Sequence, residues 1–201
     1  MSNALYVKTF AKVVVIQFNR PEIRSPLSIF VLDEINEILD VISGIAKIET
    51  VIFTGKERVF ASGADLREIA EINKNTALEF ALRGQNLMNK IATSKKQTVA
   101  AINGFCFGGA LDLALACDKR IASPNAIFSH PGAKLGIITG WGGTQRLPRL
   151  IGEAKALEMF LTAKRVNAVE ALRIGLIDKV SENPLAESLA NYTVYSSSIS
   201  L

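Results

Sequence analysis

The sequence predicts an α/β fold, because short apolar runs typical of strands alternate with segments of helical periodicity. Val13–Phe18 and Thr50–Thr54 are rich in β-branched and aromatic residues, which favour strands. The segment between them has apolar residues at helical spacing, namely Leu32, Ile35, Leu39 and Ile42. The same alternation continues along the chain and indicates a sheet covered by helices.

Length and composition are those of a globular protein. The 201 residues are 49% hydrophobic and 21% charged, which is enough to build a sizeable core without disulfides. No internal repeat or low-complexity linker interrupts the sequence before residue 180. We therefore expect one core domain over residues 1–182 and a short tail over residues 183–201. The tail is polar and Ser-rich, with no obvious buried face after Leu189.

The first part of the chain predicts a pair of strands followed by a capped helix. Leu5–Phe10 and Val13–Phe18 are two strand-forming runs around a two-residue connection. Ser28 is placed to cap the helix that follows, and Leu27 and Leu32 have the spacing of a hydrophobic staple. Thr50–Thr54 then predicts the next strand.

Later helices are marked by further capping signals. Thr76 and Glu79 have the spacing of a capping box that opens a helix through Ile91. Asn167 and Glu170 predict the start of another helix, which ends near Gly175. Other short strands and helices are expected at Arg120–Ala122, Ile127–Phe128, Thr144–Leu150, Glu153–Thr162 and Ile177–Val180. Pro and Gly in the 130–132 segment predict a loop.

Charge and cysteine usage exclude several classes of protein. The net charge is +4 and the sequence pI is about 9.1, but the basic residues are dispersed, so we expect no nucleic-acid partner. Cys106 and Cys117 have neither zinc nor redox spacing, and we expect them to pack as small apolar side chains. No metal site is expected. The N-terminus has no export-signal pattern, so we expect a cytoplasmic location.

The most informative stretch is a predicted strand, a glycine turn and a helix. Val99–Ile102 is small and apolar, Gly108 and Gly109 follow it, and a helix is expected from about Ala110 to Cys117. The positive end of that helix would face any ligand above the turn, and it could hold an oxyanion or a phosphate. Asp112, in the first helical turn, could exchange protons with such a ligand.

Two other interpretations of this stretch compete. Thr98–Cys117 is apolar enough to suggest a membrane span, but a carboxylate near the bilayer centre would cost about 3 kcal/mol. Asp112 could also serve only to stabilise the start of a helix, which contributes about 0.3–1 kcal/mol.

Four motifs in a consistent order resemble the enoyl-CoA hydratase/isomerase family, the crotonases. They are Gly63–Asp65, Asn103–Gly109, Gly142–Pro148 and Ala171–Ile177. The resemblance extends from about Val13 to Val180. It implies a crotonase-like (ClpP/crotonase) fold, a spiral of repeated ββα units, with the family's C-terminal helical region short or missing here. It also implies a homo-oligomer, either a trimer or a hexamer.

The resemblance further implies that the protein binds an acyl-CoA thioester. In that family two backbone N–H groups stabilise an enolate-like oxyanion on the thioester carbonyl, and the matching positions are Ala64 and Gly109. The substrate-binding positions are Ala64, Asp65, Leu66, Arg67 and Gly109. Coenzyme A enters as part of the substrate, so no separate cofactor is expected. Arg24 is a weaker candidate for contact with a CoA phosphate.

The usual pair of catalytic acids is incomplete. A hydratase of this family uses two glutamates, and the first position holds Asp112 while the second holds Gly132. Gly140 occupies the position at which some relatives carry another acid. His130, the only histidine, has an ordinary pKa suited to proton transfer, although a lone histidine is more often structural. Trp141 could line an acyl pocket or pack in the core.

The sequence therefore predicts an enzyme of the enoyl-CoA hydratase or isomerase type in which Asp112 is the catalytic carboxylate and hydration is impaired. One alternative is decarboxylation of a malonyl-type thioester, which needs the oxyanion hole and only one acid. Another is a non-catalytic subunit that binds acyl-CoA or completes an oligomer.

Overall fold

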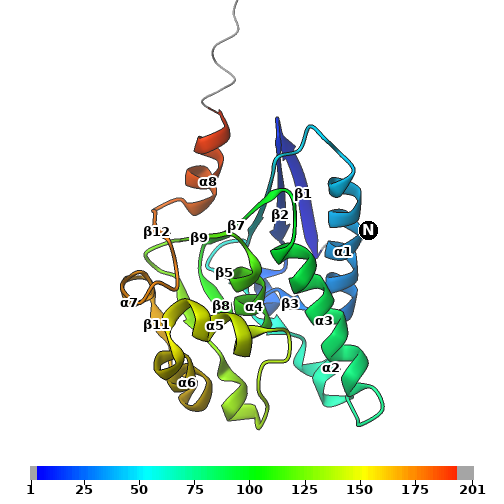
Figure 1. Ribbon diagram of the computed structural model, residues 1–201, viewed down its shortest axis with the longest axis vertical. Coiled ribbons are helices and arrows are strands. Elements are labelled where there is room, and N and C mark those ends of the chain that lie inside the picture. Colours follow the sequence, from blue (N-terminus) through cyan, green and yellow to red (C-terminus); the bar gives the residue numbers. More distant parts are fainter. Residues whose placement is uncertain (1–3, 194–201) are drawn as a thin grey trace, which may run out of the picture.

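The computed structural model describes residues 4–193 of the chain (Figure 1). Its main sheet has six strands in the order β1 (Leu5–Phe10), β2 (Val13–Phe18), β4 (Thr50–Thr54), β7 (Gln97–Ile102), β9 (Lys119–Ala122) and β12 (Lys179–Val180). β1 and β2 are antiparallel, and each later neighbour pair is parallel.

Two smaller sheets complete the strand arrangement. The first has the order β11 (Val166–Asn167), β10 (Ile127–Ser129), β8 (Phe105–Phe107) and β5 (Val59–Ala61). The second pairs β3 (Pro26–Leu27) with β6 (Gly63–Ala64) in parallel.

Eight α-helices are described, together with the short 3-10 helices η1 (Pro21–Ile23) and η2 (Pro131–Leu135). They are α1 (Ile29–Ser43), α2 (Leu66–Ala70), α3 (Ala77–Ala92), α4 (Gly109–Ala116), α5 (Gly143–Ile151), α6 (Glu153–Thr162), α7 (Ala168–Arg173) and α8 (Pro184–Thr193). No helix in the described part of the chain combines the length and apolarity that a membrane span requires. The Thr98–Cys117 stretch instead divides among β7, β8 and α4.

The strand order confirms the spiral of ββα units. In three successive units the first strand enters the main sheet, as β4, β7 and β9 do in that order. The second strand of each unit enters the four-stranded sheet, as β5, β8 and β10 do in the same order. A helical segment follows each strand pair, so the chain advances by one strand in both sheets at each turn.

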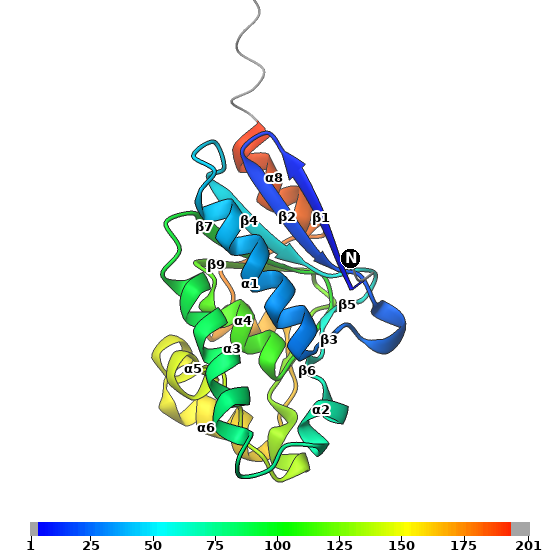
Figure 2. The same ribbon diagram turned by 90° about the vertical axis from the view of Figure 1, so that its right-hand side faces the viewer.

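The central strands β2, β4 and β7 of the main sheet are buried on both faces. Alternate residues of each strand point to opposite faces. Val51 and Phe53 of β4 belong to the main core, whereas Ile52 belongs to a second apolar cluster on the other face. Helices α1, α3 and α4 contribute to the main core. Leu185 and Leu189 of α8 cover the second cluster, and Figure 2 shows α8 and α1 on opposite sides of the sheet. The first part of the expected tail is thus a packed helix, while residues 194–201 lie outside the described region.

The capping predictions succeed in two places and fail in one. Ser28 Oγ accepts a hydrogen bond from Val31 N at 3.3 Å, and Asn167 Oδ1 accepts one from Glu170 N at 2.9 Å. The capping box at Thr76 is wrong, because Thr76 Oγ1 accepts from Asn73 N at 3.1 Å and makes no cap to α3. The turn before α3 therefore competes successfully for this hydroxyl.

Candidate active site

The two glycine turns predicted to hold a ligand lie side by side. Gly63 has φ of +90° and Gly108 has φ of +53°, conformations that favour glycine. A methyl group added to Gly63 would lie 2.7 Å from Gly109 N, and one added to Gly109 would lie 3.4 Å from Ala64 N. The backbone nitrogens of Ala64 and Gly109 are therefore near neighbours, although they are far apart in the sequence.

Asp65 fixes the geometry of the first turn. Its Oδ1 atom accepts a hydrogen bond from Arg67 N at 2.9 Å, which caps α2, and its carboxylate pairs with the Arg67 guanidinium at 2.6 Å. The hydrogen bond from the Arg67 side chain lowers the pKa of Asp65. Glu68 Oε2 accepts from Ile29 N at 2.8 Å and ties α2 to α1. Asp65 thus holds the turn that presents Ala64, and its own carboxylate is already paired within the protein.

An apolar cavity opens beside these turns. We call it the inner cavity; its volume is about 380 Å³, and it is enclosed by residues of the 62–81, 108–109 and 130–141 segments. Ala64 and Gly109 line it, and its apolar wall includes Phe80, Ile138 and Trp141. Such a volume suits a small ligand whose polar end contacts the backbone at the turns.

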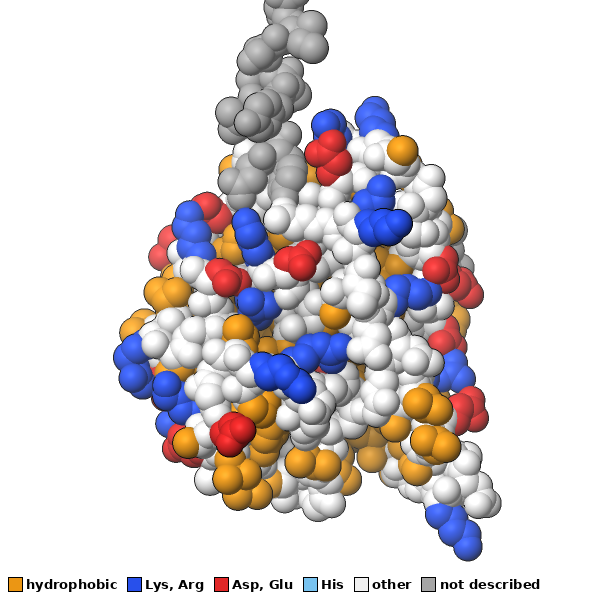
Figure 3. Space-filling model, in the orientation of Figure 1, with side chains coloured by type: hydrophobic (Ala, Val, Ile, Leu, Met, Phe, Trp, Pro, Cys, Tyr) orange, Lys and Arg blue, Asp and Glu red, His pale blue; other side chains and the backbone are white. Residues whose placement is uncertain are grey.

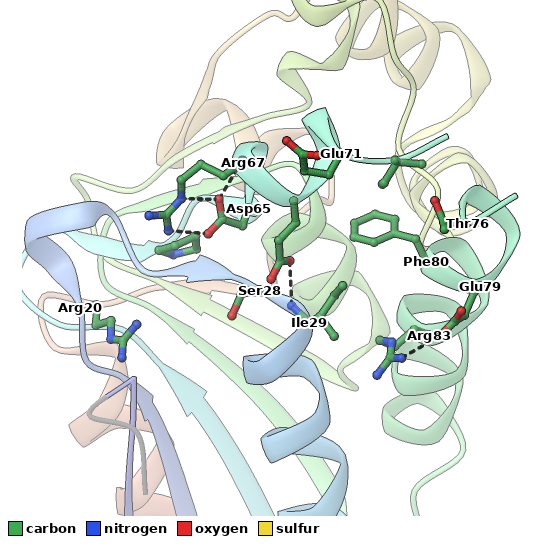
Figure 4. Close-up of a pocket in the computed structure, with 13 residues that line it drawn as sticks. Arg20, Ser28, Ile29, Asp65, Arg67, Glu71, Thr76, Glu79, Phe80 and Arg83 are labelled. Atoms are coloured by element: carbon green, nitrogen blue, oxygen red, sulfur yellow. Dashed lines mark hydrogen bonds and ion pairs between the residues drawn. The ribbon is translucent and has the colours of Figure 1, made fainter. Parts of the chain in front are cut away.

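A second cavity, of about 620 Å³, adjoins the first and is shown in Figure 4. We call it the charged cavity, because its lining combines three arginines with four acids: Arg20, Arg67, Arg83, Asp65, Glu68, Glu71 and Glu79. Ile72 and Phe80 line both cavities, so one extended molecule could occupy the two. Arg24 is exposed and lines neither cavity. Sequence reasoning missed Arg20, which the turn around η1 brings to this cavity.

The predicted substrate-binding residues divide between the two cavities. Ala64, Leu66 and Gly109 line the inner cavity, whereas Asp65 and Arg67 line the charged cavity. The five residues therefore form one surface that runs from the apolar space to the charged space.

Asp112 lies behind the inner cavity and does not line it. It is fully buried on α4, where its Oδ2 atom accepts a hydrogen bond from Thr139 Oγ1. Burial raises the pKa of Asp112 to about 7, although the Thr139 hydrogen bond, the charge of Arg146 and the backbone N–H of Trp141 act in the opposite direction. Gly143, the first residue of α5, has no side chain to displace Asp112 Oδ1. At neutral pH this carboxyl is poised between its two protonation states.

His130 lines the inner cavity next to Asp112. Its Nε2 atom is 3.6 Å from Asp112 Oδ1, and its ring centroid is 5.0 Å from that of Phe160. Burial lowers the pKa of His130 to about 4, so the ring is neutral at pH 7. Thr139, which sequence reasoning also missed, lines the same cavity and contacts the same carboxylate.

The two glycines at the positions of the missing acids have different surroundings. A methyl group on Gly132 would lie 2.6 Å from Ile137 O, whereas one on Gly140 would meet nothing within 4 Å. A side chain at Gly132 therefore requires the backbone of the 132–137 segment to move. Residues 4–193 contain no group of three or more His, Cys, Asp or Glu side chains that could hold a metal ion.

Comparisons with known proteins identify the family. The profile of the family described as "Enoyl-CoA hydratase/isomerase" matches residues 8–194. The short-chain-enoyl-CoA hydratase of Clostridium acetobutylicum is 39% identical over 181 residues, which are 90% of this chain and 69% of that protein. The crotonyl-CoA hydratase of Syntrophomonas wolfei is 41% identical over 170 residues, covering 84% of this chain and 65% of that protein.

Solved structures agree with this result. The enoyl-CoA hydratase of Bacillus anthracis superposes with a TM-score of 0.87 and 36% identity, over 96% of this chain and 76% of that one. The protein DspI of Pseudomonas aeruginosa superposes with a TM-score of 0.89 and 33% identity, over 97% and 80% of the two chains. This chain belongs to the enoyl-CoA hydratase/isomerase family and has the crotonase fold.

Proposed function

We propose that the protein binds an acyl-CoA thioester and stabilises its enolate, as an enzyme of the enoyl-CoA hydratase or isomerase type. The observation that carries this proposal is the juxtaposition of Ala64 N and Gly109 N beside an apolar cavity. Two N–H groups at this place would polarise the thioester carbonyl, and losing one such donor typically costs about 2.7–4 kcal/mol of transition-state stabilisation. The N-terminus of α4 adds favourable electrostatic potential at Gly109.

The two cavities support a division of the substrate. The acyl group would occupy the inner cavity, and the CoA portion would pass along Ala64–Arg67 toward the charged cavity. The inner cavity has a volume of about 380 Å³, which favours a small acyl group. The names of two relatives, short-chain-enoyl-CoA hydratase and crotonyl-CoA hydratase, agree with this size.

We expect hydration to be slow, because Gly132 stands at the position of the second catalytic acid of a hydratase. Addition of water needs one group to activate the water and another to deliver a proton to the α-carbon. Asp112 is placed to take part in proton transfer, but Gly132 offers only backbone atoms. General acid–base groups each contribute about 10²–10⁴-fold, so the loss of one should be measurable. Isomerisation of a 3-enoyl thioester needs one proton relay and suits this site better.

The pair of N–H groups at Ala64 and Gly109 would also support a second reaction. Decarboxylation of a malonyl-type thioester forms the enolate by loss of CO₂, so it needs the oxyanion hole and at most one proton donor. A third possibility is a non-catalytic subunit, which would bind acyl-CoA at the two glycine turns without converting it. These functions differ in which thioester is turned over, and not in whether it binds.

We also propose that the protein assembles as a homo-oligomer, either a trimer or a hexamer. Large apolar side chains are exposed on α6 and in the 130–141 segment, at Leu157, Leu161 and Ile138. Figure 3 shows apolar side chains over the lower part of the molecule, where these elements lie in Figure 1. Burying them between subunits would be favourable. A stable monomer in sedimentation experiments at micromolar concentration would contradict this assembly.

One set of assays on the purified protein tests the proposed function. Calorimetry with butyryl-CoA should show binding, and crotonyl-CoA hydration should be well below the rate of a two-acid hydratase assayed in parallel. Turnover of 3-enoyl-CoA or malonyl-CoA then distinguishes isomerase from decarboxylase. Failure to bind any acyl-CoA would refute the proposal, and hydration at the rate of the reference enzyme would refute the argument from Gly132.

A further inference from the structure

Four buried side-chain atoms in the described region have no hydrogen-bond partner, and three of them belong to one pair of residues. These three are Asp112 Oδ1 and both ring nitrogens of His130; the fourth is Thr50 Oγ1. Buried polar atoms are nearly always paired, so unpaired ones mark a catalytic group or the place of a missing partner. His130 Nε2 lies 3.6 Å from Asp112 Oδ1. This is longer than an N–H···O hydrogen bond of about 2.7–3.2 Å, so the two atoms are in contact without being hydrogen-bonded in this structure.

The pair connects the inner cavity to the carboxylate behind it. His130 lines the cavity, and Asp112 does not. Thr139 Oγ1 donates a hydrogen bond to Asp112 Oδ2. The other carboxylate oxygen, Oδ1, is the one nearest to His130 Nε2. When Nε2 is engaged by Asp112, Nδ1 is the remaining ring nitrogen. Nδ1 is buried, so its contact with a molecule in the cavity requires a small movement of the side chains around it.

We propose that His130 is the acid–base residue that contacts the bound acyl group, and that Asp112 is the positioning residue that holds its ring. This inference rests on the proposed acyl-CoA function. It explains how a carboxylate outside the cavity takes part in chemistry inside it.

The proton transfer balances without any further reactant. His130 Nδ1 takes a proton from the α-carbon of a 3-enoyl thioester, and the C–H electron pair forms the enolate held at Ala64 N and Gly109 N. The proton on Nε2 passes to Asp112 Oδ1, so the ring stays neutral. In the second half the carboxyl returns its proton to Nε2, and Nδ1 delivers a proton to the γ-carbon. The double bond has then moved into conjugation with the thioester.

The charges around the pair are compatible with this relay. Arg146 of α5 is the cation that acts on Asp112, the Cys106 thiol of β8 lies within its electrostatic range, and Phe160 of α6 covers the histidine ring. Burial places the pKa of Asp112 at about 7 and that of His130 at about 4. Below about pH 7 the carboxyl of Asp112 is therefore protonated. As the pH rises and Asp112 ionises, the pair becomes able to accept a proton.

The first test needs no ligand, because His130 is the only histidine in the sequence. Its ring signals in NMR spectra should shift with pH around neutrality, reporting the ionisation of Asp112. In Asp112→Asn that inflection should disappear. If the wild-type signals show no inflection that depends on Asp112, the two side chains are not coupled and the proposal is wrong.

The second test measures proton abstraction directly, as exchange of the α-protons of butyryl-CoA with deuterium in D₂O. We expect His130→Gln to slow exchange by about 10²–10⁴-fold, with the butyryl-CoA Kd changed by no more than a few-fold. Asp112→Asn should slow it less and remove the rise of the rate with pH near neutrality. Phe160→Leu is the matched control, because it alters packing on the His130 ring without removing a proton-transfer group.

These outcomes separate this inference from the function on which it rests. The role of His130 is overturned if the wild-type protein binds butyryl-CoA without exchanging its α-protons, or if His130→Gln does not slow the exchange. Either result leaves acyl-CoA binding intact. A protein that binds no acyl-CoA overturns both, even if the NMR coupling is present. An equal loss of exchange in His130→Gln and Phe160→Leu identifies a packing role and also contradicts the proposal.

Discussion

The indole ring of Trp141 packs directly on Gly109, in the space that a Cβ atom at that position would occupy. The same ring fills the space beside Gly84 of α3 and lies 5.6 Å, between centroids, from the ring of Phe80. Trp141 is 3% exposed and lines the inner cavity. Both functions considered from the sequence, core packing and a cavity wall, are therefore combined in one side chain.

Replacement of Gly109 by alanine should destabilise the fold. The added methyl group overlaps the Trp141 ring, and overpacking of a core typically costs about 1–3 kcal/mol. Gly44→Ala is a suitable control, because Gly44 has φ of −79° and its added methyl would lie 3.7 Å from Val41 O. Urea denaturation of both variants gives the comparison. Equal stability of the two would show that the Trp141 ring can move away at little cost.

Shortening Trp141 should shift acyl-chain preference toward longer substrates. Trp141→Leu enlarges the inner cavity, and each additional buried methylene contributes about 0.8 kcal/mol. Two more methylenes could therefore raise relative affinity about 15-fold. The measurement is the ratio of Kd values for butyryl-CoA and hexanoyl-CoA, which differ by two methylenes, with Trp141→Phe as the conservative control. An unchanged ratio in Trp141→Leu would mean that the acyl chain leaves the cavity by another route.

The glycines at positions 132 and 140 should respond differently to the same substitution. Gly132→Ala brings a methyl group to 2.6 Å from Ile137 O, so we expect a loss of about 1–3 kcal/mol. Gly140→Ala meets no atom within 4 Å and should change stability by less than about 0.5 kcal/mol. Chemical denaturation of the two variants checks this expectation. A neutral Gly132→Ala would indicate that this segment adapts and could accommodate an acid there.

Local signals in the sequence were sufficient for most elements. Ser28 and Asn167 cap their helices because each needs only the few residues that follow it. The cap predicted at Thr76 is absent for an equally local reason, since the backbone N–H of Asn73 donates to the Thr76 hydroxyl instead. The juxtaposition of Gly63 and Gly109 could be anticipated through the family resemblance, which assigns Ala64 and Gly109 to the same pair of N–H donors.

The relation of Asp112 to the cavity could not be predicted in this way. It depends on where the 130–141 segment lies after folding, and no periodic pattern fixes the path of that segment. Thr139 and Trp141 come from it, and together with His130 they stand where the cavity approaches the carboxylate. Likewise, the turn at η1 decides that Arg20 and not Arg24 lines the charged cavity.

The buried pair should also control how stability depends on pH. Asp112 has its pKa raised to about 7, so the folded protein binds more protons there than the unfolded chain, and this contribution to stability is lost as the pH rises toward 7. His130 has its pKa lowered to about 4, so the unfolded chain binds more protons, and this contribution is lost as the pH falls toward 4. Each group makes the unfolding free energy change with pH, by up to about 1.4 kcal/mol per pH unit. Between about pH 4.5 and 6.5 the two contributions have opposite signs.

Removing one member of the pair should therefore expose the slope of the other. Relative to the wild-type protein, the unfolding free energy of Asp112→Asn should increase with pH over that window, and that of His130→Gln should decrease. Urea denaturation at several pH values gives these difference profiles, in which the titration of other groups largely cancels. Phe160→Leu, which keeps both titrating groups, should run parallel to the wild-type protein. If all three variants run parallel to it, neither Asp112 nor His130 titrates differently in the folded and unfolded chains.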